Sequence, residues 1–266
     1  MARNFAADGD LVSHTGAAAT LDATGSVLLW MRPTSTTDRQ SWCATNASSY
    51  GGDFRADLAG DNFSFYRERA TAAVLMEAAA ANFAAYANNA WVFFGAVFDT
   101  AAAASAQRLF MGSLTLAAAE PSSYATQTAG SGTNTASSSP IVFGNGGVTT
   151  REFKGDIAWV GVWNRVLTQN EVRDQQWHPH VTSGCVLFSY YNGFATEPDW
   201  SGQASNGSPT GTTVVKNAPI RSHFGMDVSL DLLVAAAPPS GRIWKLAGYG
   251  GGLAGPARGL AGESVI

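Results

Sequence analysis

Carboxylates are the first residues to test for chemistry, because glycoside hydrolysis needs two carboxyl groups flanking the scissile bond. Residues two apart on a strand share one face, so a run such as Glu-x-Asp-x-Glu would present such a pair. The sequence contains no such run. Its glutamates stand singly, at positions 68, 77, 120, 152, 171, 197 and 263. We therefore expect no glycosidase centre and assign no catalytic residue.

Histidines offer one close pair, His178 and His180, separated by Pro179. A zinc site needs at least three protein ligands, and no third ligand stands nearby in the sequence. Asp8 and Asp10 form a tight acidic pair, but calcium would need several more oxygens. We expect a surface loop at the histidines, a solvated turn at the aspartates, and no bound metal or cofactor. Neither a Gly-x-Ser-x-Gly elbow nor a phosphate-binding loop is present.

Aromatic side chains at loops and strand ends could stack on sugar rings. The alternative is packing, since buried aromatic rings contribute much of a core's apolar area. Tyr86 is a further candidate by position. The residues that we select as carbohydrate-binding candidates are Tyr50, Tyr66, Tyr124, Trp177 and Trp200.

Bulk composition restricts the function classes. The 266 residues are 45% hydrophobic and only 14% charged, with a net charge of −4 and a pI near 5.5. A nucleic-acid surface usually raises the pI, so we expect no nucleic-acid partner. No run of about 18 apolar residues predicts a membrane span, and the first residues do not resemble an export signal. Cys43 and Cys185 could pair only within about 7 Å, and we expect reduced thiols.

Residues 153–172 are the most informative stretch. Residues 157–163 are apolar at successive positions, which predicts a strand covered on both faces. Thr168 and Glu171 have the spacing of a helix capping box, so residues 167–172 predict a short helical turn. Phe153 and Gly155 lead into the strand, and Asn164 and Arg165 close it.

This stretch resembles a signature of the laminin-G-like and concanavalin A-like jelly-roll superfamily, Phe-x-Gly-x-Ile followed by Asn-Arg-x-Leu-Thr-x-x-Glu-Val. Further resemblance lies in residues 26–33, 90–99, 107–114 and 140–145, and in the Asp-x-Ser-Gly turn at 199–202. The resemblance implies an all-β, concanavalin A-like or laminin-G-like jelly-roll β-sandwich. It says little about function, because the same sandwich serves lectins, glycosidases and structural modules.

The remaining strands follow from pattern and resemblance together. We expect a strand at 40–44, a hairpin at 54–58 and 63–67, and a closing strand at 185–191. Residues 72–81 have helix propensity, but the resemblance implies a strand there. Residues 119–139 should form a long polar loop. The tryptophans expected in the core are Trp30, Trp91, Trp159 and Trp163.

The composition changes near residue 222. We assign residues 1–221 to the sandwich and 222–266 to a C-terminal extension that is glycine-rich from about 240. The triplet Leu-Ala-Gly recurs at 246–248, 253–255 and 260–262, and such sequence cannot bury a core of its own. The extension is either a disordered tail or an assembly tail that orders on a partner. Its apolar anchors for assembly would be Trp244, Leu246, Tyr249, Leu253, Leu260 and Ile266.

Two functions remain open. Tailed-bacteriophage particles often carry modules of this superfamily, and their proteins often have a similar Gly-Gly-Leu-Ala-Gly end. The resemblance therefore implies a non-enzymatic structural or adhesive virion component: a capsid decoration, head fibre or tail-associated protein. Its partners would be other virion proteins, further copies of itself and cell-surface glycans, and it would be made in the host cytoplasm. The alternative is a lectin-like carbohydrate-binding module without a virion role.

Overall fold

The structure is a computed structural model of the whole chain. It describes residues 1–7, 9–15, 24–34, 39–44, 53–57, 62–67, 69, 71–78, 89–99, 102–132, 140–144, 153–216 and 219. The chain divides into two units, Met1–His223 and Phe224–Ile266. The second unit, with all six proposed assembly anchors, lies outside the described residues, as do Asp8, Tyr50 and Tyr86.

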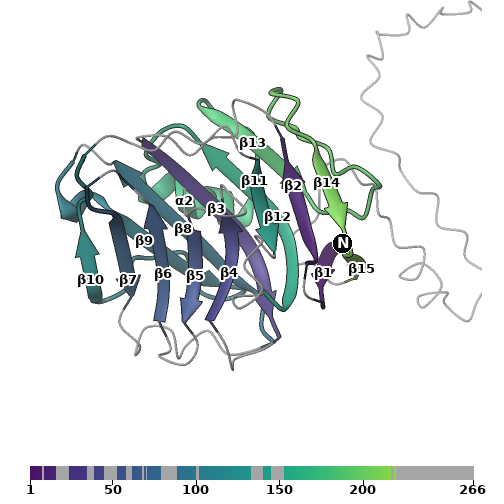
Figure 1. The fold of residues 1–266 in the computed structure, drawn as a ribbon, viewed down its shortest axis with the longest axis horizontal. Helices are drawn as coiled ribbons and strands as arrows, with labels where there is room; N and C mark the ends of the chain where they lie inside the picture. The colour runs from purple at the N-terminus through teal and green to yellow at the C-terminus, as the bar shows by residue number, and fades with distance from the viewer. Residues whose placement is uncertain are drawn as a thin grey trace, which may run out of the picture. The chain divides into compact units, whose positions relative to one another are not determined.

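Two antiparallel sheets make up the described fold (Figure 1). In the seven-stranded sheet, the strand β12 pairs with β1 through residues 155–157 and with β13 through residues 159–163. Its strands in spatial order are β15 (Thr213–Val215), β1 (Ala2–Phe5), β12 (Gly155–Trp163), β3 (Thr24–Pro33), β8 (Val92–Asp99) and β9 (Arg108–Ser113), with β13 (Cys185–Tyr190) as the seventh. A short 3₁₀ turn, η2 (Ala104–Ala106), precedes β9.

The second sheet has eight strands. In spatial order they are β10 (Tyr124–Thr128), β7 (Val74–Ala78), β6 (Asn62–Arg67), β5 (Asp53–Asp57), β4 (Arg39–Ala44), β11 (Ile141–Gly144), β2 (Leu11–His14) and β14 (Gly207–Thr210). Together the two sheets form the jelly-roll β-sandwich that the sequence resembles.

The main core lies between the sheets. Alternate side chains of each strand point inward, as the pleat requires. Phe63 of β6 meets Phe94 of β8 with ring centroids 3.9 Å apart, and Phe65 meets Phe98 at 5.1 Å. These rings come from different sheets, so they fix the two layers face to face.

A second apolar layer covers the outer face of the seven-stranded sheet. Trp30, Trp159 and Trp163 are buried in it together with Val172 of the helix α2 (Gln169–Trp177). The indole nitrogen of Trp30 donates to the carbonyl of Gln176, 2.9 Å away. All nine residues of β12 are therefore buried, which confirms the prediction of a strand covered on both faces.

Most strands predicted from the sequence are confirmed. They include β7, where helix propensity alone would have predicted a helix. Three expectations need correction. The predicted loop 119–139 contains β10 (Tyr124–Thr128), whose Tyr and Thr residues suit a strand that pairs with β7. The predicted helical turn extends to Trp177. Two further strands, β14 and β15, follow the strand expected to close the sandwich.

Two smaller expectations can also be checked. Asp10 is not solvated: it is 6% exposed, and its carboxylate accepts from the amides of Ala6 and Ala7, both at 2.8 Å. Cys185 carries a buried free thiol, and burial raises its pKa to about 12. The side chain of Cys43 lies outside the described residues.

Candidate functional site at the end of helix α2

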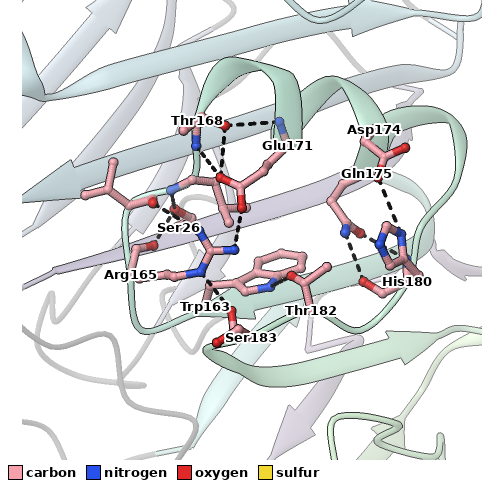
Figure 2. A network of polar contacts seen from close by, with 12 residues as sticks. Ser26, Trp163, Arg165, Thr168, Glu171, Asp174, Gln175, His180, Thr182 and Ser183 are labelled. Carbon is pink, nitrogen blue, oxygen red and sulfur yellow. Dashed lines mark hydrogen bonds and ion pairs between the residues drawn. The ribbon is translucent and has the colours of Figure 1, made fainter.

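Helix α2 begins at a complete capping box. The amide of Glu171 donates to the Thr168 hydroxyl at 3.3 Å, and the amide of Thr168 donates to the Glu171 carboxylate at 2.8 Å. Arg165 donates to the same carboxylate at 2.6 Å (Figure 2). The hydrogen bond from Arg165, together with those from Thr168, lowers the pKa of Glu171 to about 2 despite some desolvation. The start of the helix is thus fixed as the sequence predicted.

The helix has one buried and one exposed face. Val172, Gln175 and Gln176 are buried against the seven-stranded sheet and its loops. Asp174, Trp177 and His178 follow the i, i+3, i+4 spacing that places side chains on one helix face. Two buried glutamines directly before an exposed tryptophan therefore mark the C-terminal end of α2.

Gln176 holds the loop 113–118 against the helix. Its side-chain nitrogen donates to the carbonyls of Ser113 at 2.9 Å and Leu116 at 2.8 Å. Its side-chain oxygen accepts from the amide of Ala118 at 2.6 Å. Leu116 is 52% exposed on this loop. Because a buried amide here satisfies three backbone groups, the loop has one preferred position against α2.

Gln175 holds the opposite loop in the same way. Its side chain donates to the carbonyl of His180 at 2.9 Å and accepts from the amide of His180 at 3.0 Å, as Figure 2 shows. The hydroxyl of Tyr190 donates to the carbonyl of Pro179 at 2.7 Å. The segment after α2 is therefore fixed by side chains from the helix and from β13.

These anchors present an exposed group of side chains that we call the Trp177 surface: Asp174, Trp177, His178 and His180. Trp177 is 41% exposed, and its ring centroid lies 6.4 Å from that of the buried Trp30. The two carboxylate oxygens of Asp174 lie 3.7 Å from Nδ1 of His178 and Nδ1 of His180, respectively. An exposed indole beside a carboxylate and two imidazoles can stack on a sugar ring and bind its hydroxyl groups.

The histidine pair is exposed, as the sequence predicted, but Asp174 joins it from the helix. This third group was missed because the histidine pair was judged as a loop, separately from the helix before it. The signal was the Asp-x-x-Trp-His spacing at the end of α2. Among the described residues, no group of three or more histidine, cysteine, aspartate or glutamate side chains is arranged to hold a metal ion.

The other candidate aromatics lie elsewhere. Trp200 is 40% exposed in the turn after β13, where its amide donates to the carbonyl of Phe188 at 2.8 Å. Tyr66 is half-buried on β6 and Tyr124 is half-buried on β10, so both belong to the eight-stranded sheet. The Tyr124 hydroxyl accepts from the amide of Leu109, and burial raises the pKa of Tyr124 to about 12. The structure therefore does not collect the candidates into one site.

Two buried carboxylates, Glu197 and Asp156, and the half-buried Asp199 have structural partners. Glu197 accepts from the guanidinium of Arg3 at 2.6 Å and from the amides of residues 192 and 193. Asp156 accepts from Asn4 and Arg32, both at 2.7 Å. Asp199 accepts from the amides of residues 188, 201 and 205, which confirms the predicted Asp-x-Ser-Gly turn. These carboxylates hold loops and strands in place.

Three solved structures illustrate the folds to which this chain is similar. A candidate carbohydrate-binding protein from Bacteroides ovatus ATCC 8483 has a TM-score of 0.54 and 16% identity, over 83% of this chain and 61% of that one. This chain thus spans about three-fifths of that protein's length. The Ruminococcus gnavus IT-sialidase CBM40 bound to α2,3-sialyllactose has a TM-score of 0.42 and 15% identity, over 64% of this chain and 95% of that one.

Domains LG4-5 of the mouse laminin α1 chain have a TM-score of 0.42 and 13% identity, over 63% of this chain and 44% of that one. At 16% identity, the likeness to the Bacteroides ovatus protein shows a shared fold alone. Among curated proteins, none matches the sequence. No helix in the described part of the chain is both long and apolar enough to cross a bilayer.

The sequence itself matches the family description "Concanavalin A-like lectin/glucanases superfamily" over residues 6–173, more than half of the chain. This match includes the signature strand β12 and the first part of α2. The chain belongs to the concanavalin A-like lectin/glucanases superfamily.

Proposed function

We propose that the described module is a non-catalytic, lectin-like domain that binds glycans at the Trp177 surface. The observation that carries this proposal is the 41% exposure of Trp177 directly after two buried glutamines that fix both flanking loops. A large apolar ring held in a fixed position loses little entropy when a ligand stacks on it. Asp174 is on the same helix face as Trp177, three residues before it, and lies 3.7 Å from both imidazoles, so polar groups accompany the ring.

The roles of the carboxylates support a non-catalytic function. Glycosidases need one carboxyl group whose pKa is raised so that it can donate a proton near neutral pH. Glu171 has the opposite shift, since its pKa is lowered to about 2. Asp156, Glu197 and Asp199 are each occupied by several hydrogen bonds within the fold.

Glycan-array binding of the labelled protein tests the site. We expect Trp177→Ala to reduce binding by about fivefold to about 150-fold, if sugar stacking contributes on the order of 1–3 kcal/mol, as nucleobase stacking on an aromatic ring does. Trp200→Ala is the matched control, since Trp200 is equally exposed on a different element. If the Trp200 variant loses glycan binding and the Trp177 variant keeps it, the glycan site is not the Trp177 surface. A folded wild-type protein that binds no glycan would refute the proposal.

We further propose that the module acts as a structural or adhesive component of a bacteriophage virion. The support is compositional: residues 240–266 carry three Leu-Ala-Gly triplets and bulky residues at intervals, which suits ordering on a neighbouring subunit. The alternative is a lectin-like module without a virion role, which would have no need of an assembly tail.

Native mass spectrometry separates these two functions. The full chain should form oligomers, and a chain lacking residues 240–266 should be a folded, soluble monomer, because all strands in the described part of the chain lie before residue 217. Circular dichroism of the truncated chain checks its fold. A full-length chain that remains monomeric, or a truncated chain that assembles normally, would argue for the module without an assembly role.

A further inference from the structure

The position of Asp174 bears on which sugars the Trp177 surface accepts. Its carboxylate precedes Trp177 by three residues on the same helix face and is 52% exposed. We propose that the Trp177 surface binds neutral sugars and excludes acidic ones, such as sialic acids and uronic acids. This inference rests on the proposed glycan-binding function.

The Asp174 carboxylate is available to a ligand. Its distances of 3.7 Å to the two imidazole nitrogens exceed hydrogen-bonding range. Nδ1 of His180 is instead within 2.7 Å of the carbonyl of His178. A carboxylate only accepts hydrogen bonds, so its natural partners are the hydroxyl donors of a sugar, and such charge-assisted bonds are the stronger kind.

Apart from His178 and His180, which carry charge only when protonated, the charge at this end of α2 is negative. The C-terminus of a helix carries a partial negative charge that falls off within the last turn, and the last turn of α2 contains no basic residue. Arg173 is the nearest cation in the sequence, but its Nε donates to the carbonyl of Ala118 at 2.9 Å, on the side of the loop 113–118. An acidic sugar here would therefore meet Asp174 without a paired guanidinium, whereas arginine is the preferred partner of carboxylates.

Paired glycans provide the test, because each pair differs only in one charged sugar. Lactose and sialyllactose are one such pair, and other neutral cores with and without a uronic acid extend the set. At low salt, surface charges are weakly screened, so the charge difference within a pair has its largest effect. We expect the wild-type protein to bind the neutral member of a pair at least tenfold more strongly than the acidic member.

Asp174→Asn identifies the residue responsible. This variant should raise the ratio of acidic to neutral binding several-fold and weaken the binding of the neutral glycan, because it removes both the repulsion and a charged acceptor. Glu120→Gln is the matched control, because it makes the same change in net charge at a different place. The Glu120 carboxylate is 35% exposed and lies 3.4 Å from Arg108 of β9. The control should leave the ratio unchanged.

The outcomes distinguish this inference from the proposed function. A wild-type protein that binds no glycan refutes the proposed function itself. Binding that depends on Trp177 but favours the acidic member of each pair refutes only the exclusion of acidic sugars. An unchanged ratio in the Asp174→Asn variant, or an equal change in the Glu120→Gln variant, would also overturn the role assigned to Asp174.

Discussion

Replacing Trp163 with alanine should lower the free energy of unfolding by about 3–5 kcal/mol, the usual cost of truncating a buried tryptophan. Trp163 is fully buried at the end of β12. Its indole nitrogen donates to the Thr182 hydroxyl at 2.8 Å, and its ring centroid lies 6.4 Å from that of Trp159. A Cβ added at Gly161 would lie 2.6 Å from the Trp163 ring, so this ring fills space that a glycine leaves open.

The cost has two parts. Truncation removes apolar contacts and leaves a cavity, because the surrounding strands can relax only partly. It also leaves the Thr182 hydroxyl without its partner. Both effects should appear in the stability of the whole sandwich, since β12 pairs with β1, β3 and β13.

Urea unfolding followed by tryptophan fluorescence and circular dichroism measures this loss. Trp177→Ala is the comparison, because the same side chain is removed from a position that is 41% exposed. We expect the Trp177 variant to lose less than half as much stability. If Trp163→Ala has the same midpoint urea concentration of unfolding as the wild type, Trp163 is not part of the core. If the variant fails to fold, Trp163→Phe should show a smaller loss with the same sign.

The stability of the protein should also fall as the pH is lowered from about 6.5 to about 4, in part because of His14. This residue is fully buried on β2. Its Nδ1 lies 2.7 Å from the carbonyl of Ser205, and its Nε2 lies 3.1 Å from the hydroxyl of Tyr191. Nδ1 therefore carries the proton and donates, and Nε2 accepts from the tyrosine, an arrangement that only a neutral imidazole satisfies.

Burial lowers the pKa of His14 from 6.5 to about 4, although the bond to the Ser205 carbonyl opposes this shift. Above pH 6.5 the imidazole is neutral in both states, so its titration contributes nothing. Between about pH 6.5 and 4 the unfolded state binds a proton that the folded state does not, and this favours unfolding. The difference of about 2.5 pH units corresponds to on the order of 3 kcal/mol, lost in full once the pH is below 4.

Nuclear magnetic resonance measures this directly. The imidazole Cε1–H resonance of His14 should not move between pH 8 and 5.5 in the folded protein. In urea unfolding, His14→Gln should show a shallower loss of stability between pH 6.5 and 4.5 than the wild type. A His14 resonance that titrates above pH 6 would contradict the assigned environment.

Several elements of the fold were predictable because their signals are local. The apolar run at 157–163 requires cover on both faces, and β12 is buried throughout. Thr168 and Glu171 are three residues apart, which is all that a capping box needs. Strand β10 was missed because residues 119–139 are rich in polar and small residues, and only pairing with β7 makes Tyr124–Thr128 a strand.

The candidate site was predictable in part. Trp177 was selected because a loop was expected at its position, and the structure places it at the exposed end of α2. Asp174 was not selected, because its contribution depends on how far the helix extends. The capping box indicates where α2 begins, but its end depends on Gln175 and Gln176, whose partners lie 5 to 63 residues away in the sequence.

The sequence by itself determined the family, the strand covered on both faces, the start of α2 and the burial of Trp30, Trp159 and Trp163, because apolar periodicity and capping are properties of neighbouring residues. Tertiary structure alone decided which carboxylates are buried, and that the ring of Trp177 is exposed to solvent. Glu197 and Arg3 are 194 residues apart, yet they form a buried ion pair at 2.6 Å. Such contacts depend on the order of strands in the two sheets, and strand order is set by packing over the whole chain rather than by local preference.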